Sequence, residues 1–139
     1  FARPNTQNMT YVKVARLTLI LVYLVIAAGA IVRMTGRGMG CPDWPNCFGY
    51  VIPPTEESQL IWAPRKSFSK GQAIIWEETL LMANSDFTTA QQFEMSNWVT
   101  YEKHDYAAFN VFHTWSEYIN RVLGALAGLG TYVLALLSL

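Results

Sequence analysis

The 139-residue sequence has no excess of either charge, because 10 Lys and Arg residues are balanced by 10 Asp and Glu residues. A chain without surplus positive charge cannot neutralise many phosphates, so a nucleic-acid-binding role is excluded. A disordered tail is also excluded, since it needs low hydrophobicity, whereas 52% of these residues are hydrophobic. Charged residues are scarce, at 14% against about 25% in soluble domains.

Two long runs contain no charged residue at all: the 16 residues 17–32 and the 18 residues 122–139. A bilayer core takes about 20 helical residues, with roughly 17 as the lower limit. The second run meets this limit, and the first meets it when extended back to about Tyr11, with Lys13 and Arg16 reaching the headgroups. Both runs are apolar on every side, which favours transmembrane helices over buried core helices. The first run also lacks the small-x-small cleavage site of a signal peptide.

The distribution of charge predicts how the chain crosses the membrane. Residues 1–32 carry three basic and no acidic residues, a net +3, and residues 33–117 carry six basic and ten acidic residues, a net −4. By the positive-inside rule, the N-terminus lies in the cytoplasm and the loop lies in the periplasm of a bacterial inner membrane.

We therefore predict an all-α membrane protein with two transmembrane helices and a long extracytoplasmic loop. The predicted segments are a cytoplasmic flank at 1–16, a helix at 17–32 (from 11 at the earliest), the loop at 33–117 and a second helix at 118–139.

The loop divides into stretches of different composition. Residues 33–54 are dense in Gly and Pro, which predicts turns, and short helices are predicted over about 68–82 and 86–101, the second capped by Asn84 or Ser85. The loop's aromatic residues form either a lid at the membrane interface or a small core of the loop itself. They are Trp62, Trp76, Trp98, Tyr101, Tyr106 and Phe109.

Cys41 and Cys47 are the only cysteines, and they enclose the sequence PDWPN. Outside a bacterial membrane the compartment is oxidising, so a disulfide is the default, and closing this ring contributes roughly 2 kcal/mol. A zinc site lacks its other ligands. A redox-active pair stays open as an alternative, because strained and exposed disulfides are the reducible ones.

Polar residues immediately precede the second apolar run. His113, Glu117 and Asn120 lie at i, i+4 and i+7, which places them on one face of a helix. Ionisable groups at membrane depth are costly and are therefore functional candidates. The alternative is a boundary helix whose polar residues lie among the headgroups, which suits Arg121.

Small residues continue along the second run at Gly124, Ala127 and Gly128. This spacing lets another helix approach closely. Because the sequence begins with Phe1 and stops inside an apolar run, we expect further helices in the parent protein or from partner subunits.

These segments together resemble the haem A synthase family of multi-span membrane proteins. The shared pattern is V-R-x-T-G-x-G-x-x-C-P-D-W-P-x-C, then a P-P turn, then E-Y-x-x-R followed by Gly. The matching residues are Val32, Arg33, Thr35, Gly36, Gly38, Cys41, Pro42, Asp43, Trp44, Pro45, Cys47, Pro53, Pro54, Glu117, Tyr118, Arg121 and Gly124. The resemblance covers roughly residues 14–54 and 113–130. The loop with HDYAAFN is similar to that of a Bacteroidetes-like branch.

The resemblance implies an eight-helix protein built from two related four-helix halves, of which this chain would be an N-terminal portion that is inactive alone. Such a protein holds haem through histidine pairs and oxidises a methyl group of haem O to the formyl group of haem A for cytochrome c oxidase. Glu117 then matches the acid of the family's E-x-x-H motif, and Cys41 and Cys47 match its outer-loop cysteine pair. Haem O is the implied substrate, haem B is a second haem to consider, and haem O synthase and cytochrome c oxidase are the implied partners.

The chain departs from the family at Asn120, where many members carry a haem-ligating His. An amide is a poor ligand for haem iron. Either His113 ligates the iron, or this half binds haem differently, with Asn120 as a hydrogen-bond donor to a propionate or a bound water and Arg121 also contacting haem. His113 lies about 10 Å from position 120 along a helix, so using it would move the haem toward the outer surface. His104 is expected to be solvated or interfacial.

Two other functions compete with the enzyme. A non-catalytic membrane subunit or assembly factor of a respiratory complex would use the aromatic loop as a docking surface. A membrane thiol–disulfide protein would use the cysteine pair, but the sequence contains no second pair of cysteines.

Overall fold

The computed structural model describes residues 6–35, 40–102 and 109–139. It contains two units, which we describe separately. The first, here called the helix pair, comprises residues 1–38 and 119–139 as far as they are described, and the second, the lobe, comprises residues 39–118.

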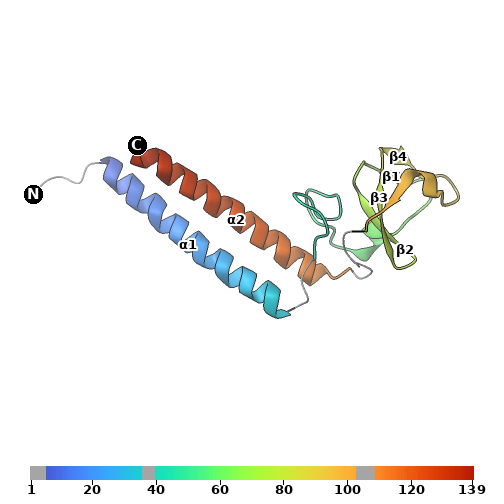
Figure 1. Ribbon diagram of the computed structural model, residues 1–139, viewed down its shortest axis with the longest axis horizontal. Helices are drawn as coiled ribbons and strands as arrows, with labels where there is room; N and C mark the ends of the chain where they lie inside the picture. Colours follow the sequence, from blue (N-terminus) through green and yellow to red (C-terminus); the bar gives the residue numbers. More distant parts are fainter. Residues whose placement is uncertain (1–5, 36–39, 103–108) are drawn as a thin grey trace, which may run out of the picture. The chain divides into compact units, whose positions relative to one another are not determined.

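The helix pair consists of α1 (Thr6–Thr35) and most of α2 (Val111–Ser138), which run antiparallel (Figure 1). Both contain spans long and apolar enough to cross a membrane, with mean hydropathies of 2.3 and 1.6. Only 6% of each span's apolar window is buried within the chain. These helices therefore expose apolar side chains on most sides, as lipid or other helices require. The structure has α2 begin at Val111, earlier than the predicted second span.

The two helices approach each other at glycines. A methyl group added at Gly130 would overlap the Thr18 side chain, and one added at Gly29 would lie 3.6 Å from Asn120 Nδ2. Gly124 and Gly128 behave differently, since an added methyl at either would meet no described atom within 4 Å. Of the predicted small residues Gly124, Ala127 and Gly128, Ala127 is the buried one, and the two glycines lie away from the contact with α1.

The lobe is built around an antiparallel sheet with the strand order β2-β3-β5. These strands are β2 (Ala73–Trp76), β3 (Thr79–Ala83) and β5 (Trp98–Thr100). A second two-stranded ladder joins β1 (Ser67–Phe68) to β4 (Phe87–Thr88), and short 3₁₀ turns η1 (Glu57–Leu60) and η2 (Met95–Asn97) complete the lobe.

Side chains alternate along β2 and β3 between two core clusters. Ala73 and Leu80 belong to the disulfide cluster, whereas Ile74 and Leu81 belong to the aromatic cluster. The disulfide cluster contains Cys41, Cys47, Phe48, Leu60, Ala73 and Leu80, and the aromatic cluster contains Phe68, Ile74, Leu81, Ala83 and Trp98. The sheet is thus buried on both faces.

Two of our predictions are wrong here: the lobe is not all-α, and residues 68–82 and 86–101 form strands and turns rather than helices. Because both faces of the sheet are buried, β2 and β3 read as short continuous apolar runs, which periodicity alone cannot distinguish from a helix. Ile74 and Leu81, assigned to one helical face, are in fact directly paired across two strands. Asn84 caps no helix, since its backbone and side chain donate hydrogen bonds to Asn97 O and Ser96 O.

The hairpin between β2 and β3 turns on only two residues, Glu77 and Glu78. Their φ angles are 47° and 62°, in the left-handed region. Two-residue hairpins favour this geometry because it matches strand twist, but they normally place Asn and Gly there. The lobe therefore contains a conformationally costly turn.

The loop's aromatic residues form its own core, which is the second of the two alternatives that we considered. Trp76 stacks on Phe93 with ring centroids 4.1 Å apart, and Trp62 lies edge-on to both rings.

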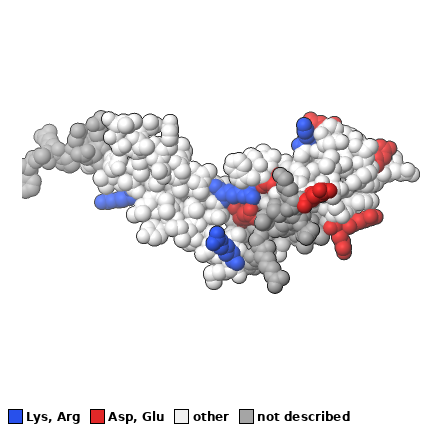
Figure 2. Space-filling view, in the orientation of Figure 1, with Lys and Arg blue, Asp and Glu red and all other residues white. Residues whose placement is uncertain are grey.

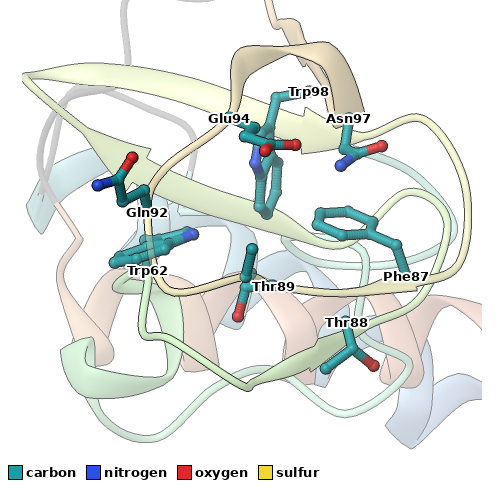
Figure 3. A pocket seen from close by; sticks show the side chains of 9 residues that line it. Trp62, Phe87, Thr88, Thr89, Gln92, Glu94, Asn97 and Trp98 are labelled. Atoms are coloured by element: carbon teal, nitrogen blue, oxygen red, sulfur yellow. The ribbon is translucent and has the colours of Figure 1, made fainter.

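Beside these rings is a hollow of about 50 Å³. It is lined by Trp62, Phe87, Thr88, Thr89, Ala90, Gln92, Glu94, Asn97 and Trp98 (Figure 3). Small-molecule sites usually measure about 300–1,000 Å³, so this hollow accommodates water rather than haem. Tyr106 and His104 lie outside the described residues.

Charge is distributed unevenly between the units. Residues 39–118 carry ten acidic and four basic residues, while most of the visible helix pair has no charge (Figure 2). The lobe is thus the acidic, water-compatible part of the chain.

Candidate functional site

The cysteine segment folds into a tight loop closed by the predicted disulfide, which joins Cys41 to Cys47. Cys47 and Tyr50 exchange both backbone hydrogen bonds, at 2.9 and 3.1 Å, and Gly49 N–H donates to Asp43 Oδ2 at 2.8 Å. The two cysteines are only 3% and 1% exposed. Such burial limits attack by an external thiolate and favours the structural interpretation over the redox one.

Two hydrogen bonds connect this loop to β2 and to the segment that follows β5. Ala73 N–H, at the start of β2, donates to Phe48 O at 2.9 Å, and the Tyr101 hydroxyl donates to Pro42 O at 2.6 Å. The Phe48 ring packs edge-on against Phe109, with centroids 5.7 Å apart. Burial in this region raises the pKa of Tyr50 above its ordinary value.

The start of α2 is fixed by hydrogen bonds from two side chains. Asn110 caps the helix, since its Oδ1 accepts from the backbone N–H of Phe112 and His113 at 3.0 and 3.3 Å. One turn later, Trp115 Nε1–H donates to Pro54 O at 3.3 Å. The N-terminus of α2 is therefore capped by Asn110 and hydrogen-bonded through Trp115 to the proline turn that follows the cysteine loop.

A single peptide group of the cysteine loop contacts two side chains of α2. The Thr114 hydroxyl donates to Gly40 O at 2.9 Å, and Cys41 N–H donates to Glu117 Oε2 at 3.1 Å. The Gly40 carbonyl and the Cys41 N–H belong to the same planar peptide unit. A methyl group at Gly40 would lie 2.5 Å from His113 O and Thr114 N, so the loop backbone lies directly on the helix backbone.

The structure thus brings Glu117 to the cysteine segment, although the two are 76 residues apart in the sequence. His113 lies in the first turn of α2 and is half-buried, with its ring edge-on to Phe112 at 6.0 Å. Asn120 and Arg121 belong to the helix pair instead.

Asn120 has an unusual environment within the helix pair. It lies opposite Gly29 of α1, and its Oδ1 is buried without a hydrogen-bond partner among the described residues. A buried polar atom without a partner costs about 1–3 kcal/mol, so it marks a place where a donor from outside the described chain can bind.

Sequence reasoning missed Thr114 and Gly40. Thr114 is 1% exposed, and it lies three residues before Glu117, at the spacing that puts two side chains on neighbouring positions of a helix. Gly40 immediately precedes Cys41 but is not one of the fixed positions of the quoted pattern. Only the hydrogen bond between Thr114 and Gly40 shows that both residues belong to the site.

These features define a class of protein: a membrane protein with two apolar helices and a disulfide-bonded lobe whose cysteine loop packs on the start of the second helix. Comparison with known proteins agrees with this class. A family model described as "Cytochrome oxidase assembly protein" matches residues 13–100, more than half of the chain. The chain therefore belongs to the cytochrome oxidase assembly protein family, which is the family of the haem A synthases.

Curated relatives support this assignment. The chain is 47% identical over 45 residues to the haem A synthase of Shewanella oneidensis, a match covering 32% of this chain and 14% of that protein. It is 43% identical over 51 residues to that of Bacillus licheniformis, covering 35% and 17%, and 49% identical over 35 residues to that of Symbiobacterium thermophilum, covering 25% and 11%. The chain thus matches less than a fifth of the length of each of these relatives. No solved structure matches it.

Proposed function

We propose that this chain is part of a haem A synthase that oxidises a methyl group of haem O to the formyl group of haem A for cytochrome c oxidase. The observation that carries the proposal is the hydrogen bond from Cys41 N–H to Glu117 Oε2. It joins the two most specific parts of the family pattern, the cysteine segment and the E-Y-x-x-R segment, into one site.

Glu117 has the chemistry that this oxidation requires. Converting a methyl group to a formyl group takes one oxygen atom from water and releases four protons and four electrons, so the electrons must pass to an acceptor outside this chain. A carboxylate can accept one of these protons or stabilise a cationic carbon. A fixed amide donor on one carboxylate oxygen orients the side chain, which leaves the carboxylate preorganised for this role. We assign Glu117 as the acid–base or charge-stabilising group.

Haem is the substrate in this proposal, and His113, Asn120 and Arg121 are the residues that we propose to contact it. The His113 imidazole would be able to ligate the haem iron, whereas Asn120 offers only an amide. The buried Oδ1 of Asn120 fits a protonated propionate or a water, and Arg121 supplies a positive charge one residue later. We propose haem O as the reacting molecule and keep haem B as a second haem to consider.

We further propose that the N-terminus is cytoplasmic and the lobe is periplasmic, in a bacterial inner membrane. The charge asymmetry of +3 against −4 and the disulfide of the lobe both support this orientation. The remaining haem-binding side chains would come from further helices of the same protein, which the open faces of Gly124 and Gly128 can accommodate.

A bacterial host that makes haem O but lacks its own haem A synthase provides the test. The full-length parent protein is expressed in this host, and the extracted haems are separated by chromatography and identified by mass. The proposal predicts that haem A appears, and a host containing only haem O would contradict it.

One observation favours a second candidate, a non-catalytic assembly factor of a respiratory complex. Asn120 stands where many haem A synthases have a haem-ligating His. An Asn120→His variant distinguishes the two functions in the same host. If wild-type protein gives no haem A and the variant gives none either, while the protein co-purifies with a respiratory complex, the assembly function holds.

A further inference from the structure

The peptide group between Gly40 and Cys41 is bound at both of its ends by one face of α2. Thr114 Oγ1 donates to its carbonyl at 2.9 Å, and its N–H donates to Glu117 Oε2 at 3.1 Å. Because a hydrogen bond at a carbonyl polarises the whole peptide unit, the Thr114 contact strengthens the N–H as a donor to Glu117.

We propose that Thr114 is a positioning residue for Glu117 and acts through the Gly40–Cys41 peptide. The hydroxyl of Thr114 fixes this peptide on the helix, and the peptide in turn fixes the carboxylate. This inference depends on the proposed function in one respect, because the proposed function gives Glu117 its chemical role.

The burial of the contact supports a fixed arrangement. Thr114 and Cys41 are 1% and 3% exposed, so water does not compete well for their hydrogen bonds. Cys41 Sγ also lies 3.7 Å from Thr114 O, which places the disulfide against the same turn of the helix. The half-buried carboxylate of Glu117 is thus linked, through partly buried hydrogen bonds, to the buried residues Cys41 and Thr114.

Gly40 is required for this close approach. Any side chain there would begin 2.5 Å from the helix backbone at His113 and Thr114, and the peptide would have to move away from α2. Its N–H would then no longer lie within hydrogen-bond distance of Glu117. Gly40→Ala is therefore expected to reproduce the effect of losing the Thr114 hydroxyl.

Thr114→Val tests the proposal in the full-length protein, because valine keeps the shape of threonine and removes only the hydroxyl. The loss of one neutral hydrogen bond corresponds to a roughly three- to ten-fold lower rate of haem A formation. Thr114→Ser retains the hydroxyl and is the matched control, expected to keep a rate close to wild type. Protein level and disulfide content, measured by immunoblot and thiol alkylation, should be the same in both variants.

A double-mutant cycle separates positioning from a general structural effect. If Thr114 acts through Glu117, Thr114→Val adds no further loss in a Glu117→Gln background, because the amide that replaces the carboxylate cannot take up a proton however it is positioned. An additive loss in the double variant would overturn the proposal, as would full activity of Thr114→Val.

The outcomes also separate this inference from the function on which it rests. If Glu117→Gln alone leaves haem A formation unchanged, the role of Glu117 is refuted. If Glu117→Gln abolishes activity and Thr114→Val does not lower it, Glu117 keeps its role and only the positioning by Thr114 is refuted.

Discussion

The two-residue turn between β2 and β3 allows a direct test of the lobe's structure. Glu77 and Glu78 have φ angles of 47° and 62°, a conformation that costs an L-residue roughly 1–2 kcal/mol each. Asn tolerates this region and Gly adopts it freely, and both Glu side chains are exposed, so their replacement removes no packing. Glu77→Asn with Glu78→Gly is therefore expected to stabilise the lobe by about 1–2 kcal/mol, since part of the gain is lost to the freer unfolded chain.

Tryptophan fluorescence follows the unfolding of the lobe selectively and therefore measures this gain in stability. All five tryptophans of the chain, at positions 44, 62, 76, 98 and 115, belong to the lobe. Thermal unfolding of the chain in detergent should show the midpoint rising by roughly 4–16 °C, given about 4–8 °C per kcal/mol for a unit of this size.

A pair of conservative substitutions controls for charge. Glu77→Gln with Glu78→Gln removes both negative charges but keeps both side chains, so the midpoint should change by less than half as much. The reasoning is refuted if the Asn–Gly variant gains nothing, or if the Gln–Gln variant gains equally.

Three further predictions concern other parts of the chain. Gly130→Leu should weaken the association of α1 with α2, because the new side chain would displace Thr18. Gly128→Leu should leave this association unchanged, since a methyl group added at Gly128 would meet no described atom within 4 Å. Cysteine cross-linking between the two helices measures the difference. Replacing Cys41 and Cys47 by Ala should destabilise the lobe by about 2–3 kcal/mol in urea unfolding, and an unchanged midpoint would show that the ring closure contributes nothing. Burial raises the folded-state pKa of Tyr50, so the contribution of its neutral hydroxyl to stability is fully present below about pH 10 and is lost as the pH rises through the folded pKa. Tyr50→Phe should remove this loss of stability at alkaline pH. A pH profile of unfolding that is identical in the variant and the wild type would contradict the raised pKa.

The apolar helices and the disulfide were predictable because their signals are local. A charge-free run of membrane-spanning length and two cysteines enclosing PDWPN need no knowledge of distant contacts. The family assignment was predictable for the same reason, since most of its pattern falls within sixteen consecutive residues, Val32 to Cys47.

The fold of the lobe was not predictable in this way. Its strands are short and buried on both faces, and the pairing of Ile74 with Leu81 depends on a turn of two glutamates that carries no turn signal. The sequence also favoured a single face for His113, Glu117 and Asn120. All three residues lie in α2, but the sequence did not predict that Glu117 accepts a hydrogen bond from the Gly40–Cys41 peptide, which Thr114 also binds, because these contacts join residues more than 70 positions apart.

The most direct test of the central claim is the haem composition of the deletion host expressing the full-length protein with Glu117 replaced. Glu117→Gln keeps the size of the side chain and can still accept the Cys41 hydrogen bond, but it carries no charge and cannot take up a proton. The account predicts that haem O accumulates and haem A falls at least roughly a hundred-fold, as expected for loss of an acid–base group. Wild-type amounts of haem A in the Glu117→Gln protein would contradict it.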